Sequence, residues 1–448
     1  MTAKTTKKNM TIFRQLCELI PTHLVSQLAR EHKIKSRDYS PWSHVVTHLY
    51  VHLFRVVGLN DACDSLGMNS TKLRAIRGAT PPKRNTLSNA NTKRDSDMAK
   101  ALYWRMLEVL QKTQPSFAQG GKRQRGYLKR FKAVIHAVDS TTIQLVANCM
   151  PWAEHRRRKA AAKCHMNLNL SSMLPHYAVV DTAKDADAKR AWQVCAWLKK
   201  GEIVVFDRAY LAYDHLYDLT QRGVFWVTRA KKNSQFNVIK KLQTTRNSNV
   251  IRDEIVELKA KATHKNYPET FRRVEVLVEI DGKQTVMVFV TNNTEWSAWS
   301  VAELYRARWE IEVFFKELKQ TLKLVDFIGY SKNAVEWQIW TGLLVHLLMR
   351  FMAHLSQWGQ SFTRLFSLLR SGLWHNYGIL SLLESYGTAG PPFRICACPN
   401  MVYLPGFEAP DKYPMGQPKR RKSKQAEKYA ENLQGKIKSG RENTNKKA

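Results

Sequence analysis

Two apolar runs, each closed by an aspartate, constrain the fold of this chain more than any other feature. Residues 133–139 read AVIHAVD, and residues 201–207 read GEIVVFD. Short apolar runs of this kind are typical of strands that are buried on both faces of a sheet. A carboxylate at the end of such a strand projects from a rigid core, so Asp139 and Asp207 are candidates for one functional site.

The segments around these runs predict an α/β domain. Residues 163–172 and 176–181 alternate as strands do, and residues 187–200 have the pattern of an amphipathic helix. A helical pattern at 211–223 and a strand pattern at 224–232 follow the second aspartate. Strands followed by strand–helix alternation favour a mixed sheet that is covered by helices.

The regions on either side have a different character. Residues 11–115 place apolar side chains three and four positions apart, which predicts helices. Within them, residues 59–78 resemble a helix-turn-helix with Gly67 in its turn. The second helix, with Lys72, Arg74 and Arg77, would enter a DNA major groove. Many helical hairpins share this pattern. Residues 272–293 predict a β-hairpin with Asp281 and Gly282 in its turn.

These changes of pattern predict six segments. They are a helical DNA-binding domain (1–117), a basic linker (118–132), the first part of the α/β core (133–231), a β-rich insertion (232–295), the last part of the core with an acidic helix and C-terminal helices (296–390), and a basic, disordered tail (391–448).

A helix predicted over residues 297–325, with Ser297 or Ser300 as its N-cap, supplies a third carboxylate. At about 100° per residue, four polar side chains fall within a sector of about 60° beside an apolar stripe: Tyr305, Arg308, Glu312 and Lys319. Three other glutamates fall on the opposite side, where we expect a solvated face: Glu303, Glu310 and Glu317. The alternative for Glu312 is an ordinary i,i+4 ion pair with Arg308.

Other acidic residues compete with these three. Asp181 also ends a strand-like run and is the main rival, whereas Asp185, Asp187 and Asp214 have a helical or loop context. Three carboxylates brought together can hold two divalent metal ions, which can drive in-line attack at a phosphodiester. His136 and His165 are possible neighbours of such a site, although a single histidine near a strand is more often structural.

The formal net charge of +35 over 448 residues favours a polyanionic partner, and nucleic acid is the commonest one. A ribosome-associated or simply basic protein is the alternative. The N-terminal residues lack an apolar signal segment, and the apolar stretch 337–355 is interrupted by His346, Arg350 and His354. We therefore expect a cytoplasmic, nucleoid-associated protein with reduced cysteines and no membrane span.

Three motifs in this order resemble those of IS4-family DDE transposases. Tyr305-x2-Arg308-x3-Glu312-x6-Lys319 matches the Y-R-E-K signature of that family. FDRAY at 206–210 resembles its motif around the second aspartate, and VDSTTIQL at 138–145 resembles the motif around the first. The resemblance covers about residues 130–360. The N-terminal helical region is similar to an extra domain that binds terminal inverted repeats in one branch of the family.

The resemblance implies an RNase H-like mixed sheet flanked by helices and interrupted by a β-rich insertion. It implies that Asp139, Asp207 and Glu312 hold two Mg²⁺ or Mn²⁺ ions, and that Tyr305, Arg308 and Lys319 grip phosphates. Further DNA contacts are expected from basic residues near the second aspartate and the following strand: Arg208, Arg229 and Lys231. Surface charge without DNA contact is the alternative for the last two.

The activity implied is cut-and-paste DNA transposition by a homodimer on paired element ends, without ATP. Some relatives flip a base onto a tryptophan of the insertion, for which Trp296 and Trp299 are candidates; the alternative is that both are core residues. Three other functions remain open: a nuclease or resolvase without strand transfer, a DNA-binding regulator without catalysis, and a basic RNA-binding protein.

Overall fold

The computed structural model describes residues 10–118, 128, 130–145, 149–156, 159–182, 187–244, 249–280, 282–322 and 326–386. The tail predicted at 391–448 and most of the linker predicted at 118–132 lie outside these residues. All described residues belong to one unit, which comprises residues 1–390.

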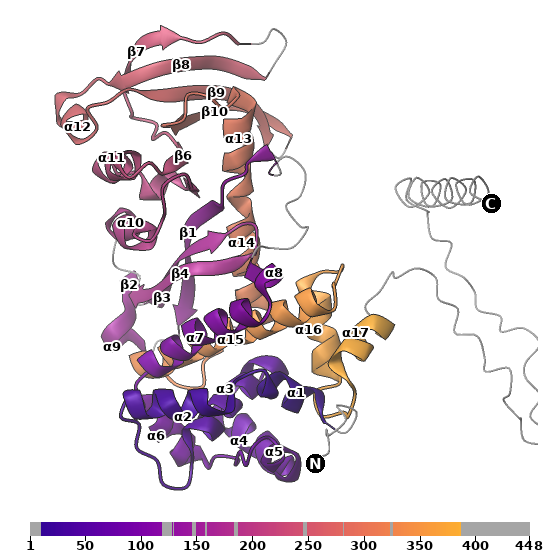
Figure 1. The fold of residues 1–448 in the computed structure, drawn as a ribbon. Helices are drawn as coiled ribbons and strands as arrows, with labels where there is room; N and C mark the ends of the chain where they lie inside the picture. Colours follow the sequence, from indigo (N-terminus) through magenta and orange to yellow (C-terminus); the bar gives the residue numbers. More distant parts are fainter. Residues whose placement is uncertain are drawn as a thin grey trace, which may run out of the picture. The chain divides into compact units, whose positions relative to one another are not determined.

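A mixed sheet of ten strands runs through the described part of this unit (Figure 1). The strand order is β2-β3-β1-β5-β6-β10-β9-β8-β7, and β4 also pairs with β3. β1 is antiparallel to β3, whereas β1, β5 and β6 are parallel to one another. The strands are β1 Ile135–Leu145, β2 Glu154–Arg156, β3 Lys159–Asn169, β4 Leu174–Thr182, β5 Ile203–Phe206, β6 Phe225–Arg229, β7 Phe236–Lys241, β8 Val250–Leu258, β9 Phe271–Ile280 and β10 Lys283–Thr291.

Helices cover both faces of the central strands, which explains why these strands are apolar throughout. Val138 of β1 and Val204 of β5 lie in a core with α10 (Asp187–Cys195) and α11 (Tyr213–Gln221). Their neighbours Ala137 and Val205 point to the opposite face and lie in the larger core. On that face, α13 (Ala298–Ala307) contacts β5 and β6, and α14 (Trp309–Lys316) contacts β1.

The β-rich block continues the central sheet rather than forming a sheet of its own. β10 pairs antiparallel with β6, and β9, β8 and β7 follow outward, with α12 (Lys261–Asn266) after β8. The hairpin predicted at 272–293 is confirmed, because Ile280 pairs with Lys283. Gly282 has a φ of +75° in the turn, a conformation that favours glycine.

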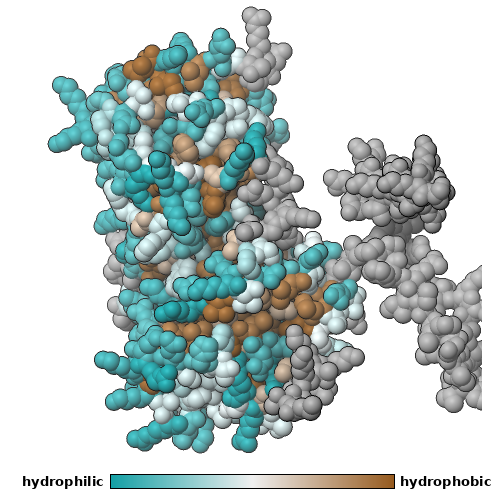
Figure 2. Space-filling view, in the orientation of Figure 1, coloured by the Kyte–Doolittle hydropathy of each residue, from teal (hydrophilic) through white to brown (hydrophobic). Residues whose placement is uncertain are grey.

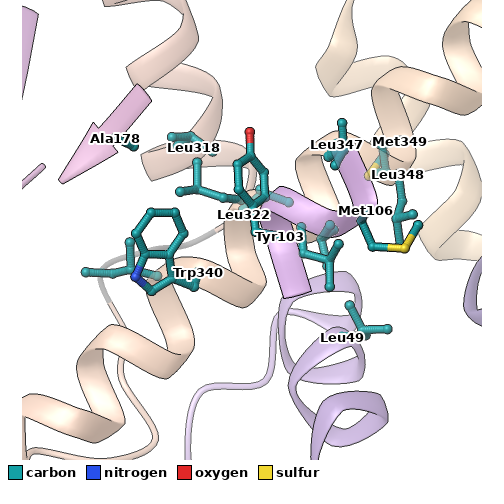
Figure 3. Packing of buried hydrophobic residues seen from close by; sticks show 14 of the residues in the cluster. Leu49, Tyr103, Met106, Ala178, Leu318, Leu322, Trp340, Leu347, Leu348 and Met349 are labelled. Carbon is teal, nitrogen blue, oxygen red and sulfur yellow. The ribbon is translucent and has the colours of Figure 1, made fainter. Parts of the chain in front are cut away.

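The N-terminal helices pack against the long helix α15 (Lys332–Leu355). Figure 3 shows Leu49, Tyr103 and Met106 of the N-terminal helices among Leu347 and Leu348 of α15. The helices are α1 Ile12–Glu18, α2 Thr22–Glu31, α3 Pro41–Phe54, α4 Leu59–Met68, α5 Ser70–Arg74, α6 Arg84–Lys93, α7 Asp97–Thr113, α8 Pro115–Ala118 and α9 Met150–Ala153, followed near the C-terminus by α16 Phe362–Ser371 and α17 Ile379–Tyr386.

The stretch predicted as a core helix is therefore the buried α15. Within the described residues, no helix combines the length and the apolar character that crossing a membrane would require. The five cysteines in the described part of the chain are buried and unpaired.

The helix-turn-helix predicted at 59–78 differs from the structure. Gly67 lies inside α4 rather than in a turn, and α5 has only five residues. Arg77 donates a hydrogen bond of 2.8 Å to the Ile20 carbonyl and lies over the Trp42 ring. Arg77 therefore holds neighbouring helices together, so it does not have the free side chain that a DNA contact requires.

Candidate active site

The register of two parallel strands places the aspartates side by side. Val138 of β1 pairs with Phe206 of β5, so Asp139 and Asp207 are the next residues on neighbouring strands. β5 ends at Phe206, as predicted, but β1 continues to Leu145 through its pairing with β3. The prediction that Asp139 ends its strand is therefore wrong; only its pairing with β5 ends there. Residues 140–145 (STTIQL), which follow Asp139, remain in the sheet because β3 supplies their hydrogen-bonding partners.

The third carboxylate comes from a helix that is broken near the site. Ser297 caps α13 by accepting a hydrogen bond from the Ser300 amide, as predicted. The single helix predicted for 297–325 is instead divided: α13 ends at Ala307, α14 begins at Trp309, and a π-helical turn spans Glu317–Thr321. Breaks and π-turns of this kind often occur at functional sites.

Arg308, at the junction of α13 and α14, joins two of the carboxylates. Its Nη1 donates a hydrogen bond of 2.7 Å to Asp139 Oδ2, and its Nη2 donates one of 2.6 Å to Glu312 Oε1. The Arg308 side chain is only 13% exposed, so these bonds act in a partly desolvated environment where they are strong. The i,i+4 pair considered for Arg308 and Glu312 therefore exists, and it is part of a larger cluster.

Tyr305 connects the remaining aspartate to the same helix. Its hydroxyl donates a hydrogen bond of 3.2 Å to Asp207 Oδ1, and its ring packs 4.9 Å from the ring of Phe289. Burial, together with the negative charge of Asp207, raises the pKa of Tyr305 to about 12. Tyr305 is therefore a neutral hydrogen-bond donor near neutral pH.

The carboxyl group of Asp139 has a raised pKa. Burial raises its pKa to about 6, against the opposing effects of the Arg308 charge and the Ser140 amide. The charges of Asp207 and Glu312 raise it further. The three acidic groups thus influence one another, which is the electrostatic character of a site that concentrates negative charge.

The other glutamates of this helix are less solvated than predicted. Glu310 is exposed, but Glu303 is buried and forms ion pairs with Arg130 and Arg306. Glu317 is half-buried and is bound by Arg350 and His346 of α15. The helical wheel cannot show this, because Arg130 and α15, which lie outside this helix, supply partners of Glu303 and Glu317.

The basic residues predicted to contact DNA lie at varied distances from the carboxylates. Arg229 acts on the pKa of Tyr305 and is therefore close to the site. Lys319 is half-buried near Cys164, and burial lowers its pKa. Arg208 is exposed directly after Asp207. Lys231 donates a hydrogen bond of 3.0 Å to the Leu211 carbonyl, so its ammonium is partly used within the fold.

Asp187 lies beside the site, which the sequence did not indicate. It accepts hydrogen bonds of 2.9 Å from Ser140 Oγ and 2.7 Å from Lys163 Nζ, and Ser140 directly follows Asp139. His165 donates to or accepts from the buried Tyr210 hydroxyl at 2.8 Å in the same region. Asp187 is the first residue of α10, the amphipathic helix that follows β4. This position at the start of a helix was the sequence feature that could have indicated its place near the site. The rival Asp181 lies on β4 and is ion-paired with Arg190.

The tryptophans also differ from one another. Trp296 packs between the rings of Phe131 and Phe225, in agreement with the core alternative, whereas Trp299 is 48% exposed. Trp309, which directly follows Arg308, is 61% exposed and was not singled out from the sequence.

The donor set suits a hard divalent cation, although its present arrangement is not that of a metal site. Carboxylate oxygens are the ligands that Mg²⁺ and Mn²⁺ prefer. Among the residues that the structure describes, no three acidic, histidine or cysteine side chains are grouped as they would be around a metal ion. Arg308 explains this, because its guanidinium takes one oxygen of Asp139 and one of Glu312.

The raised pKa of Asp139 predicts a pH-dependent stability. A carboxylate whose folded pKa is about 6, against 3.8 ordinarily, stabilises the fold at low pH and loses that contribution as pH rises through about 6. At about 1.4 kcal/mol per pKa unit, the loss is at most about 3 kcal/mol. Asp139→Asn cannot ionise and should lack this dependence. Urea unfolding of both proteins at about pH 5 and about pH 8 measures the part of this loss that occurs above pH 5, about 1.4 kcal/mol. An equal pH dependence in both proteins would contradict the assignment.

Comparisons with known proteins point to one family. Residues 130–348 match the family described as the transposase DDE domain, and residues 8–76 match a domain of unknown function (DUF4372). DDE domains generally use divalent metal ions. The matched region of the DDE domain includes Asp139, Asp207 and Glu312, together with Tyr305, Arg308 and Lys319.

Individual relatives agree with the domain match. The chain is 29% identical to the y4zB protein of Sinorhizobium fredii over 53% of this chain and 66% of that protein. It is 28% identical to a protein of the insertion sequence element IS5377 of Geobacillus stearothermophilus, over 50% and 58%. Both carry provisional transposase names. The transposase InsG for the insertion sequence element IS4 of Escherichia coli is 26% identical over 41% of this chain and 42% of InsG.

The matched region covers less than two thirds of each of these three relatives. The domain match covers the segment that holds all three carboxylates, and the relatives include the protein of IS4 itself. Residues 130–348 thus form a transposase DDE domain, and the chain is similar to the IS4-family DDE transposases.

Proposed function

We propose that this protein moves an insertion sequence by cut-and-paste transposition: it binds the terminal inverted repeats, cleaves DNA at the element ends, and joins the freed 3′-hydroxyls to target DNA. One observation carries the proposal. Arg308 holds Asp139 and Glu312 together, while Tyr305 of the same helical segment holds Asp207. A strand, a strand end and a helix thus converge on three acidic groups within the DDE domain.

The sheet supports an RNase H-like core. Its strands β4-β3-β1 are antiparallel, β5 and β6 are parallel to β1, and α10 and α11 follow β4 and β5. The two aspartates directly follow the last residue pair between β1 and β5. In this proposal, strands β7 to β10, between β6 and α13, form the β-rich insertion. This topology brings the carboxylates of Asp139 and Asp207 together. Glu312, the third, comes from α14, which contacts β1.

Asp139, Asp207 and Glu312 would hold two divalent metal ions, Mg²⁺ or Mn²⁺. When bound, such ions activate the attacking water or 3′-hydroxyl and stabilise the leaving oxygen. The neutral Tyr305 hydroxyl and the Arg308 guanidinium can donate hydrogen bonds to a phosphate once the carboxylates no longer occupy them. Arg308 thereby has two roles: it neutralises the carboxylates before the ions and DNA arrive, and it binds a phosphate oxygen afterwards.

DNA is the proposed partner, as element ends and as target. Lys319, Arg229, Arg208 and Lys231 would contact its phosphates and position the scissile strand without reading sequence. Two element ends must be held together for excision and joining, which a homodimer would accomplish. The formal net charge of +35 supports binding to a polyanion, and we propose the cytoplasm as the compartment because the substrate is there.

The test uses the full chain and duplex DNA that carries the flanking ends of the gene, with Mg²⁺, with Mn²⁺, or with a chelator. The expected result is cleavage at the repeat end with either metal, none with the chelator, and joining of the cut end to a supercoiled target plasmid. Cleavage without joining would favour a nuclease. Specific binding without cleavage in any divalent metal would overturn the enzyme assignment and favour a DNA-binding regulator.

A further inference from the structure

Helix α6 presents an outward face that has the chemistry of a base-reading surface. Residues 83–93 read KRNTLSNANTK, with Lys83, Arg84 and Lys93 and no carboxylate. Leu87, Ala90 and Asn91 are buried, whereas the polar side chains on the other side are exposed: Arg84, Asn85, Ser88, Asn89, Thr92 and Lys93. The helix lies between the two segments matched by the family models, 8–76 and 130–348.

Around the axis of α6, the uncharged polar side chains lie in one sector and the cationic side chains lie on either side of it. At about 100° per residue, the uncharged side chains of Ser88, Thr92, Asn85 and Asn89 occupy a sector of about 100°. Arg84 and Lys93 lie about 40° beyond its two edges. A helix in a major groove would therefore direct its amides at the base edges and its cations at the phosphates on both sides.

The residue choice is unfavourable for a helix that has only a structural role. Asparagine, serine and threonine are poorer helix formers than the lysine, glutamate and alanine that usually cover exposed helical faces. In the part of the chain that the structure describes, the side chains of Asn85, Ser88 and Asn89 make no hydrogen bond, while the Thr92 hydroxyl donates to the Ser88 carbonyl. Their donors and acceptors remain available to a ligand.

The buried side of α6 fixes this face in place. Asn91 Oδ1 lies 2.9 Å from His44 Nε2 and 3.0 Å from His48 Nε2, and all three side chains are buried. The Asn91 carbonyl accepts a hydrogen bond of 2.8 Å from Asn333 of α15. A helix that is held rigidly from below can present its outer face with the precision that base recognition needs. Figure 2 shows a largely hydrophilic surface over the end of the unit where α2, α5 and α6 lie.

We infer that α6 is the recognition helix of this protein: it enters the major groove of duplex DNA at the element ends, where Asn85 and Asn89 read bases while Arg84 and Lys93 hold phosphates. Asparagine pairs through two hydrogen bonds with the edge of adenine, so we expect A·T pairs at the contacted positions. This inference rests on the proposed function, because it assumes that the chain binds specific DNA ends.

The test begins with selection of bound duplexes from a random-sequence library by the full chain. The selected duplex and a scrambled duplex of the same composition then serve as binding probes for the wild type and three variants. In Asn85→Ala/Asn89→Ala, we expect affinity for the selected duplex to fall about 5- to 150-fold per lost contact, with binding to the scrambled duplex unchanged. Alanine favours the helix, so the thermal stability of this variant should not decrease.

Two further variants distinguish base recognition from electrostatic attraction to the phosphates. Lys93→Ala should weaken binding to both duplexes equally and reduce the slope of log affinity against log salt by about 0.9. Asn249→Ala removes an exposed asparagine at the distant β-rich end of the sheet and should leave both affinities unchanged. The inference is overturned if the double variant keeps the wild-type preference for the selected duplex, and the proposed end binding then still stands. If the wild-type chain selects no sequence, both are overturned.

Discussion

Glu312→Gln and Asp207→Asn should each reduce Mg²⁺-dependent cleavage of end DNA by about 10³-fold or more, while DNA binding is retained. Both substitutions preserve the volume of the side chain and an oxygen for Arg308 or Tyr305, but they remove the negative charge that a divalent cation requires. Cleavage is measured in single-turnover reactions, and binding is measured separately on the same duplex, so that a loss of chemistry is distinguished from a loss of affinity.

The same helix offers a matched control. Glu310 lies two residues before Glu312 and is exposed. Glu310→Gln changes the net charge by the same amount as Glu312→Gln and should leave cleavage at the wild-type rate. If Glu312→Gln cleaves as well as Glu310→Gln, then Glu312 serves only in its ion pair with Arg308, and the third metal ligand must be sought elsewhere; Asp187 would be the next residue to test.

The second large effect concerns stability. Arg272 of β9 is buried and forms two hydrogen bonds with the buried Asp253 of β8, of 2.7 Å and 2.6 Å. Asp253→Ala would leave the guanidinium buried without its counter-charge, which typically costs about 3–5 kcal/mol. We expect the urea midpoint of unfolding to fall accordingly, or the protein to be recovered only in aggregates.

This pair also bears on the active site. Arg272 donates to the carbonyl of Trp296, the residue before Ser297, which caps α13. Loss of Asp253 should therefore loosen the start of the helix that carries Tyr305 and leads to Arg308. Arg252→Ala is the control, because Arg252 pairs with Glu275 at the surface and is 56% exposed; its loss should cost about 1 kcal/mol or less. Equal urea midpoints for the two variants would show that the buried pair contributes no more to stability than the exposed pair does.

The sequence was informative where the pattern is local. The apolar runs before Asp139 and Asp207 predicted strands, Asp281-Gly282 predicted the hairpin, and Ser297 predicted a helix cap. In each case the signal lies within a few residues, because burial, turn conformation and capping act over that range. The relation of Tyr305, Arg308 and Glu312 on one helical face was also readable, since one helical turn separates them.

The sequence was less informative where a neighbouring element determines the result. The wheel placed Glu303 and Glu317 in solvent, but Arg130 and α15 bury them. The division of the helix at Arg308 and the continuation of β1 to Leu145 both depend on partners that are distant in the chain. Asp187 was set aside for its helical context, yet the sheet brings it to Ser140.

By itself, the sequence determined which residue types could form a site, on which strands and helix they lie, and the family to which the motifs belong. Only the tertiary structure decided that Arg308 bridges Asp139 and Glu312, that Tyr305 binds Asp207, and that α6 turns a polar face outward. The physical reason is that charge pairing, burial and pKa depend on distances across the fold. These distances are set by strand register and helix packing, which no short segment of sequence encodes alone.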